Sequence, residues 1–380
     1  MRMRNVGVMA LVLMASAAGL AQQPKVTHAQ MATRSGDNLQ REISAAQAPT
    51  WFGYTVPATH WVNSSWGDNV LHLEGDDQQI VSQPDDSANV PPAMILLRVT
   101  SGKVDRVLIE QTDREVDAGG LAFVWLTGVN PADSVKTLRS VVEASIAEAA
   151  KASAAKLAPV TTTDRERARI ERDMQRAPER EFRRMQDRGM TAIAFTNIPE
   201  ATAALKSFTA ASYPPNVREK AAFWLANERG VEGFKTDAEL VKSDKDDAFR
   251  EKLVFDLTLV KGASRGAAID ALIAVAKTDS AQKVRSQAQF WLAQMAGKKL
   301  VDDSRIARAL NDSAEDDPEV AIRKSAVFAL SRLPADQGVP ELIQVASSSK
   351  DATTRKEAIF WLGKSKDPRA LEFLEKVVKQ

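Results

Sequence analysis

The stretch TRKEAIFWLG, residues Thr354–Gly363, has four further versions upstream in this chain. They are VREKAAFWLA from Val217, FREKLVFDLT from Phe249, VRSQAQFWLA from Val284 and IRKSAVFALS from Ile322. Every copy has an arginine in second place, a phenylalanine in seventh and a leucine in ninth, and successive arginines are 32, 35, 38 and 32 residues apart. Self-similarity with this period predicts a solenoid of stacked helices in which each repeat packs on its neighbours.

A second apolar segment precedes each copy, so each repeat is expected to be a pair of helices. These segments are residues 198–208, 237–241, 267–276, 304–310 and 339–346, and a last one, residues 369–378, has no partner. We therefore expect residues 197–380 to form about five helix pairs with a terminal half-repeat. The motif leucines are expected in the core, because apolar side chains at helical spacing normally face it: Leu225, Leu257, Leu292, Leu330 and Leu362.

The motif resembles the HEAT repeats of bacterial HEAT-like proteins. In that family a turn with an aspartate precedes a helix that opens with Val-Arg, and the resemblance implies that Asp–Arg pairs link neighbouring repeats. The position six residues before the arginine holds Asp244, Asp279 and Asp317 in the second, third and fourth copies, but Ser212 and Ser349 in the first and fifth, where Asp351 is a substitute for Ser349. The resemblance covers residues 197–380 and implies an α-solenoid, whereas such repeats serve many roles.

The five motif phenylalanines point away from the leucine face. At about 100° per residue, the phenylalanine lies about 140° and the leucine about 340° from the arginine. In HEAT repeats this helix lines the concave side, so the rings are expected to form an aromatic ladder edged by Glu219, Lys252, Lys324 and Lys356. The ladder, which is our candidate binding site, consists of Phe223, Phe255, Phe290, Phe328 and Phe360.

The sequence leaves a second interpretation of the ladder open. Helices in a solenoid touch neighbours on two flanks, so stacked repeats could bury these rings against one another instead of exposing them. The tryptophans that follow three of the phenylalanines, Trp224, Trp291 and Trp361, are expected to pack at the edge of the core.

The N-terminal residues 1–21 have the pattern of a secretory signal peptide. Arg2 and Arg4 precede an apolar or small run from Val6 to Leu20, and a small-x-small site ends at Ala21. The run of about fifteen residues is short for a membrane span of roughly 20 residues, and no second run of that length follows. We therefore expect an exported chain, periplasmic or extracellular after cleavage near Ala21, with no membrane span in its mature part.

Three segments are expected between the leader and the solenoid. Residues 22–48 are polar and are interpreted as a flexible lead-in. Residues 49–130 predict a small β-rich module, with a hairpin of 94–99 and 104–109 and a further strand at 121–126. Residues 131–196 predict connecting helices, the first capped by Asn130, with a charged linker of nine arginines and seven acidic residues at 164–188.

Composition and motifs argue against most catalytic and nucleic-acid functions. The chain has no cysteine, and 51 basic residues face 50 acidic ones, so neither a thiolate site nor a polyanion partner is expected. The sequence holds none of the HExxH, GxSxG, P-loop or dinucleotide motifs. We expect no cofactor and no metal site, although His60 and His72 lie near several acidic residues of the β-rich module.

The sequence thus predicts a mainly α protein: a small α+β or β-rich N-terminal module followed by a HEAT-like α-solenoid. The expected function is a non-catalytic scaffold of the bacterial cell envelope that binds a protein or peptide through the solenoid, with no nucleic-acid partner. The alternative is an envelope hydrolase or ligand-processing enzyme whose site lies in the N-terminal module.

Overall fold

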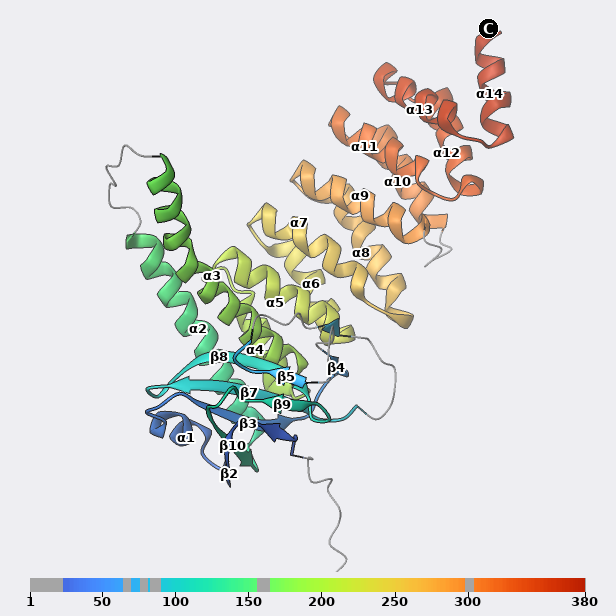
Figure 1. Ribbon diagram of the computed structural model, residues 1–380. Coiled ribbons are helices and arrows are strands. Elements are labelled where there is room, and N and C mark those ends of the chain that lie inside the picture. Colours follow the sequence, from blue (N-terminus) through green and yellow to red (C-terminus); the bar gives the residue numbers. More distant parts are fainter. Residues whose placement is uncertain are drawn as a thin grey trace, which may run out of the picture. The chain divides into compact units, whose positions relative to one another are not determined.

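The computed structural model describes residues 23–63, 70–75, 81–82, 90–155, 165–297 and 304–379. The chain divides into two compact units near Val129 (Figure 1). The expected signal peptide of residues 1–21 lies outside the described residues, as does Trp66. Across the described residues, no helix combines the length and the apolar character that a membrane crossing requires.

The first unit is built on a five-stranded sheet. Its strand order is β2 (Gln30–Ser35), β10 (Ala122–Thr127), β3 (Thr50–Val56), β7 (Ala93–Thr100) and β8 (Lys103–Gln111). Strand β10 runs parallel to both β2 and β3, whereas β3 and β7 are antiparallel. The strands β3 and β7 are almost wholly buried, which accounts for the runs of large apolar residues in their sequences.

The expected hairpin is present between β7 and β8. Ser101 and Gly102 form its two-residue turn with φ values of 51° and 73°. A positive φ at both central residues is the geometry whose twist matches that of antiparallel strands. The further strand expected at residues 121–126 is β10, shifted by one residue.

The lead-in differs from the sequence-based expectation. Residues 22–48 were expected to be flexible because they are polar, yet they contain β1 (Val26–Thr27), β2 and α1 (Leu39–Ala45). Pairing with partners about ninety residues away orders the polar strands: β1 lies beside β9 (Glu115–Asp117) and β2 beside β10. The helix α1 is held by two fully buried side chains, Leu39 and Ile43.

Two smaller sheets complete the first unit. In one, β9 lies between β1 and β5 (Val70–His72), and all three strands are parallel. The other pairs β4 (Val62–Asn63) with β6 (Val81–Ser82).

The second unit is a stack of helices. They are α2 (Pro131–Ala155), α3 (Arg165–Phe195), α4 (Pro199–Phe208), α5 (Pro215–Glu228), α6 (Gly230–Ser243), α7 (Asp247–Asp256), α8 (Arg265–Thr278), α9 (Gln282–Gly297), α10 (Ser304–Asp316), α11 (Val320–Ser331), α12 (Ala335–Ser348), α13 (Ala352–Lys364) and α14 (Pro368–Val378), with short 3-10 turns η1 (Leu257–Leu259) and η2 (Gly262–Ser264). Within the described part of the chain, α4–α13 form five pairs and α14 is the terminal half-repeat. The predicted solenoid is confirmed.

The helix pairs stack into two layers (Figure 1). The helices that carry the sequence motif, α5, α7, α9, α11 and α13, lie side by side in one layer, which we call the motif layer. The helices α6, α8, α10, α12 and α14 lie side by side in the other layer. The predicted core face is confirmed, because the motif leucines are at most 1% exposed.

The helices α2 and α3 belong to this stack. They pack against each other, and α3 also packs against α4 and α5. Met190, Ile193 and Phe195 near the end of α3 are buried. Residues 131–196 therefore do more than connect the two units, because their helices cover the end of the repeat array, as terminal capping elements of solenoids do.

A ladder of ion pairs joins the repeats along the motif layer. Arg250 donates from Nε to Asp279 Oδ2 at 2.8 Å and from Nη2 to Asp279 Oδ1 at 2.9 Å. Arg285 binds Asp317 in the same way at 2.9 and 3.1 Å, and Arg218 forms the corresponding pair with Asp244. Each arginine thus reaches from its own helix to the turn of the next repeat, as the family resemblance implied.

The paired arginine and aspartate also form hydrogen bonds with the backbone of the turns that lead into the motif helices. Arg285 donates Nη1 to the Asp279 carbonyl of its own repeat at 2.8 Å, and the Asp279 carboxylate accepts the Ala281 N–H at 2.8 Å. Burial opposes ionisation of Asp279, but the hydrogen bonds from Arg250 and Ala281 outweigh it and lower its pKa. One aspartate therefore ends one helix, starts the next and receives the arginine of the preceding repeat.

The last ion pair of the series is longer, and Ser349 stands here where the three preceding turns have an aspartate. Arg323 donates to Thr354 Oγ1 at 3.3 Å and lies 3.7 Å from the substitute carboxylate of Asp351. Arg355 donates Nη1 to the carbonyl oxygens of Ser349 and Lys350.

Replacing Arg285 by Met tests how much the arginine–aspartate ion pairs contribute to stability. The variant leaves Asp317 buried without its cation, so we expect the free energy of unfolding to fall by about 3–5 kcal/mol in denaturant titration. Arg355→Met is the matched control, since it removes hydrogen bonds to carbonyls but strands no carboxylate, and it should cost no more than about 1.5 kcal/mol per bond. If the free energy of unfolding falls equally in the two variants, the ion pair adds no stability beyond that of the hydrogen bonds to carbonyl groups.

Candidate partner-binding surface

The motif phenylalanines lie at the solvent-facing side of the motif layer. Phe360 is 53% and Phe290 37% exposed, and the other three rings are half-buried. Of the two interpretations left open by the sequence, full burial between repeats is therefore wrong for these rings, because each keeps part of its surface in water.

The rings gather into three clusters among the described residues, each centred on a tryptophan. Trp224 contacts Phe195 and Phe223 with centroid distances of 5.5 and 5.1 Å. The second cluster is Phe255–Trp291–Phe290, at 4.9 and 5.2 Å, and the third is Phe328–Trp361–Phe360, at 5.2 Å for both contacts. The second and third clusters each join two neighbouring helices of the motif layer, whereas the first joins α5 to α3. Trp291 and Trp361 therefore couple adjacent repeats as well as packing at the core edge.

The third cluster is held in place by charged neighbours. The Trp361 indole N–H donates to Glu357 Oε1 at 3.0 Å, and Glu357 is paired with Lys324 at 3.1 Å. A tryptophan fixed at its polar end presents its apolar face with little loss of rotamer freedom on binding.

Two cations also belong to the third cluster. The Arg332 guanidinium lies over the Phe328 ring at 5.7 Å from its centroid, and Lys364 Nζ lies over the Phe360 ring at 5.6 Å. Both side chains are exposed, and neither forms an ion pair with any described residue. The equivalent positions of the other copies, nine residues after the motif arginine, are Asn227, Leu259 and Gln294.

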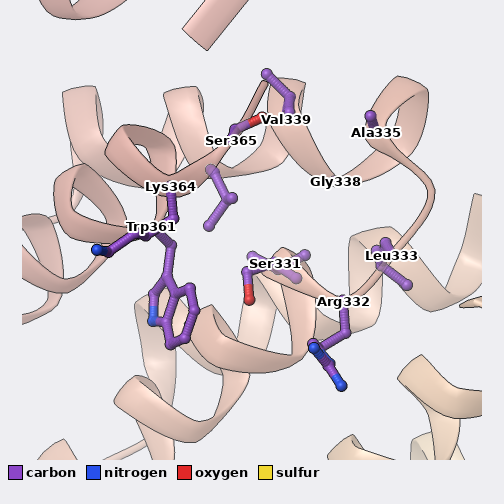
Figure 2. A pocket seen from close by; sticks show the side chains of 11 residues that line it. Ser331, Arg332, Leu333, Ala335, Gly338, Val339, Trp361, Lys364 and Ser365 are labelled. Carbon is purple, nitrogen blue, oxygen red and sulfur yellow. The ribbon is translucent and has the colours of Figure 1, made fainter. Parts of the chain in front are cut away.

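A pocket of about 190 Å³ opens beside this cluster, between the ends of α11 and α13 and the start of α12 (Figure 2). Its apolar lining comes from buried Leu330, Leu333, Val339 and Leu342. The other residues that line it are Trp361, Arg332, Lys364, Ser331, Ser365, Ala335 and Gly338. Gly338 lets α12 approach closely, since a Cβ there would lie 2.4 Å from the Leu330 carbonyl oxygen.

Arg332 and Lys364 were not predicted as functional residues. The recurring motif runs from the arginine to the leucine, and the two cations lie two residues beyond that leucine. Extending the alignment to the ninth residue would have found them, because only the last two copies are basic there.

The histidines of the first unit form a different, exposed arrangement. Asp117 Oδ2 lies 3.1 Å from His28 Nδ1 and 3.2 Å from His72 Nδ1, and the histidine side chains are 76% and 51% exposed. The Gly119 N–H and His28 lower the pKa of Asp117. His72 was considered together with His60, whereas the structure places it on Asp117 with His28. Within the described residues, no group of three His, Cys, Asp or Glu side chains could hold a metal ion.

Two buried carboxylates lie in the second helix pair. Asp237 on α6 is fully buried, and neither carboxylate oxygen has a hydrogen-bond partner among the described residues. Burial, helped by nearby Asp256, raises the pKa of Asp237 to about 9. Burial and the charge of Glu219 raise the pKa of Asp256 to about 7. Asp237 is therefore protonated at neutral pH and serves packing rather than charge pairing.

The comparisons with known proteins agree with the helical architecture. A family model described as HEAT repeats matches residues 307–380. Residues 307–380 of this chain are HEAT repeats. No curated protein sequence matches the chain significantly.

The solved structures that match the chain do so at low sequence identity and low TM-score. The complex of CpcE and CpcF of phycocyanin lyase from Nostoc sp. PCC7120 is 21% identical, with a TM-score of 0.32, over 42% of this chain and 97% of that chain. The E. coli protein YibA is 20% identical, with a TM-score of 0.33, over 48% and 65%. Human deoxyhypusine hydroxylase in complex with glycerol is 14% identical, with a TM-score of 0.28, over 64% and 77%. No function is transferred from them.

Replacing Asp237 by Asn tests the buried carboxylates. A carboxyl whose pKa rises on folding stabilises the folded chain fully below its unfolded pKa near 4, and that contribution is lost as the pH rises towards 9. The variant has no such group, so its free energy of unfolding should exceed that of the parent by about 1–3 kcal/mol at pH 8. This difference in free energy of unfolding between the variant and the parent should become smaller towards pH 5.

Denaturant titrations of both proteins at several pH values measure this difference. Asp270→Asn is the control, because Asp270 is exposed on the neighbouring α8 and should leave the slope with pH unchanged. A parallel pH dependence of the parent and Asp237→Asn would show that Asp237 ionises normally in the fold.

Proposed function

We propose that this chain is a non-catalytic scaffold that binds a protein or peptide through the aromatic ladder of its motif layer. The single observation that carries this is the partial exposure of all five motif phenylalanines, with Phe360 and Phe290 the most exposed. Rings that serve only as spacers between repeats would be buried. Exposed aromatic side chains that repeat along one face mark interaction surfaces.

The clusters suit binding energetically. Binding energy concentrates in a few aromatic anchors that are already fixed before the partner arrives. Each motif ring contacts a tryptophan, and Trp361 is further held by Glu357. Among the charged residues expected beside the ladder, Lys324 is engaged with Glu357, whereas Lys252 and Lys356 are exposed and would set orientation and association rate more than affinity.

The rival function, an enzyme with its site in the first unit, has less support from the geometry. A general acid or base works best where burial and neighbours tune its pKa. The side chains of His28 and His72 are 76% and 51% exposed, whereas ligand sites usually enclose most of the surface of what they bind. We therefore favour the helical unit as the functional part of the chain.

We propose further that the chain is exported to the cell envelope. The support is the pattern of residues 1–21, with two early arginines and a small-x-small site. Expression in a bacterium with an intact export system, followed by intact-mass and N-terminal analysis, should give a mature chain that begins at or near Gln22. A chain that keeps Met1 and stays in the membrane fraction would contradict this.

The binding proposal is tested with the Phe290→Ser, Phe360→Ser double variant. Two random peptide libraries, one displayed with free C-termini and one with free N-termini, are selected against the parent protein. Peptides enriched on the parent should bind the double variant at least tenfold more weakly, because the two most exposed rings are anchors.

Melting temperatures accompany the binding measurements. Lys283→Ala, a variant of an exposed residue on α9, is the control and should bind as the parent does. If the double variant stays folded and binds every selected peptide at full strength, the ladder is not the binding surface. Enrichment of no peptide from either library would contradict the proposal as a whole.

A further inference from the structure

The pocket beside the third cluster brings together an apolar lining and two cations that the first three copies of the motif lack. It joins an apolar lining, the edge of Trp361 and two exposed cations without ion pairs to described residues, Arg332 and Lys364. The same positions in the earlier repeats are uncharged, so the cations are not needed to build a repeat. They are a property of this one place in the stack.

The volume of the pocket limits what it can hold. Sites for whole small molecules usually measure about 300–1,000 Å³, whereas this pocket measures about 190 Å³. That space suits one anchor residue of a longer chain whose remainder lies outside. Because Trp361 lines the pocket and also contacts both Phe328 and Phe360, a chain leaving the pocket would run directly onto the ladder.

The charges decide which residue would be the anchor. Figure 2 shows that the Arg332 and Lys364 side chains extend to different sides of the pocket, so each exposed side chain would swing towards the pocket mouth to meet a bound anion there. The nearest acidic side chain of the cluster, Glu357, is already neutralised by Lys324. The start of α12 also lines the pocket through Ala335 and has no capping side chain, so the positive end of its dipole adds to the field. Asp336 in that first turn interacts with Arg369.

We propose that this pocket binds the C-terminal residue of a partner protein, with an apolar side chain inside and the terminal carboxylate between Arg332 and Lys364. A C-terminal residue carries both groups on one Cα, whereas an internal aspartate or glutamate carries the charge but no apolar side chain. Capture of a terminal carboxylate is a recurring mode of peptide recognition. This inference rests on the proposed function, because the rest of the partner lies along the ladder.

The test compares matched probes by fluorescence anisotropy. From the free C-terminal library, the best-enriched peptide is synthesised with a free carboxylate, with a C-terminal amide, and with its last residue replaced by Ser. We expect the last position of the enriched peptides to be Leu, Ile, Val, Met or Phe. The amide and the Ser form should each bind at least tenfold more weakly.

Charge variants locate the carboxylate. Arg332→Gln and Lys364→Gln should each weaken the free-acid peptide about tenfold and should leave the affinity for the amide unchanged. Lys366→Gln is the matched control, since Lys366 is an exposed cation two residues further on that does not line the pocket. Melting temperatures verify that all three variants are folded.

The outcomes separate this inference from the proposed function. Peptides that depend on Phe290 and Phe360 but bind equally well as acid and amide would overturn the terminal-carboxylate site and leave the ladder standing. The inference would also fail if octanoate displaced the peptide as strongly as an unlabelled copy of it does, because the occupant would then be a fatty acid. A selection that enriches only peptides with blocked C-termini would overturn it as well.

Discussion

The buried arginine–aspartate pairs are the interaction on which the helical unit depends. Each pair is almost out of water, and each arginine and aspartate has several hydrogen bonds. Burying a charge is costly unless its partner and its remaining bonds are in place. The geometry of each turn is therefore tied to that of the next, and the repeats can stack in only one register. The leucine face supplies most of the apolar burial, and the ion pairs decide how successive layers are positioned.

The side of the motif helices that carries the phenylalanines is therefore not required to hold the stack together. Because the core face and the ladder of ion pairs already join the repeats, the phenylalanine positions need not be buried to stabilise the stack. The rings remain partly exposed and contact tryptophans across helix boundaries. They add cohesion between neighbours and still present an apolar face. A surface made this way is rigid without being part of the core, which suits it to recognition.

Sequence periodicity predicted the helical unit well, for a physical reason. Every repeat obeys the same local constraints, so the burial of Leu225, Leu292 and Leu330 can be predicted from the recurrence of leucine at this position. A feature that occurs only once has no such recurrence in the sequence. The polar strand β2 is ordered by β10, which lies about ninety residues away in sequence, and no local pattern reports such a pairing. Likewise, the sequence does not indicate that Arg332 and Lys364 share a pocket, because that pocket forms only when α12 packs beside α11 and α13. The pairing of His72 with His28 through Asp117 depends on three neighbouring parallel strands and was equally out of reach.

The unequal strength of the ionic joints has a consequence for how the array comes apart. The joint between α11 and α13 lacks the bidentate pair of the two joints before it, since Arg323 lies 3.7 Å from Asp351 and reaches the next repeat through the Thr354 hydroxyl. In a linear array, local opening starts at the weakest neighbour interface. The walls of the pocket come from both sides of this joint. Opening at this joint therefore dismantles the pocket before it disturbs the rest of the stack, so the packing of α11 against α13 and the presence of the pocket rise and fall together.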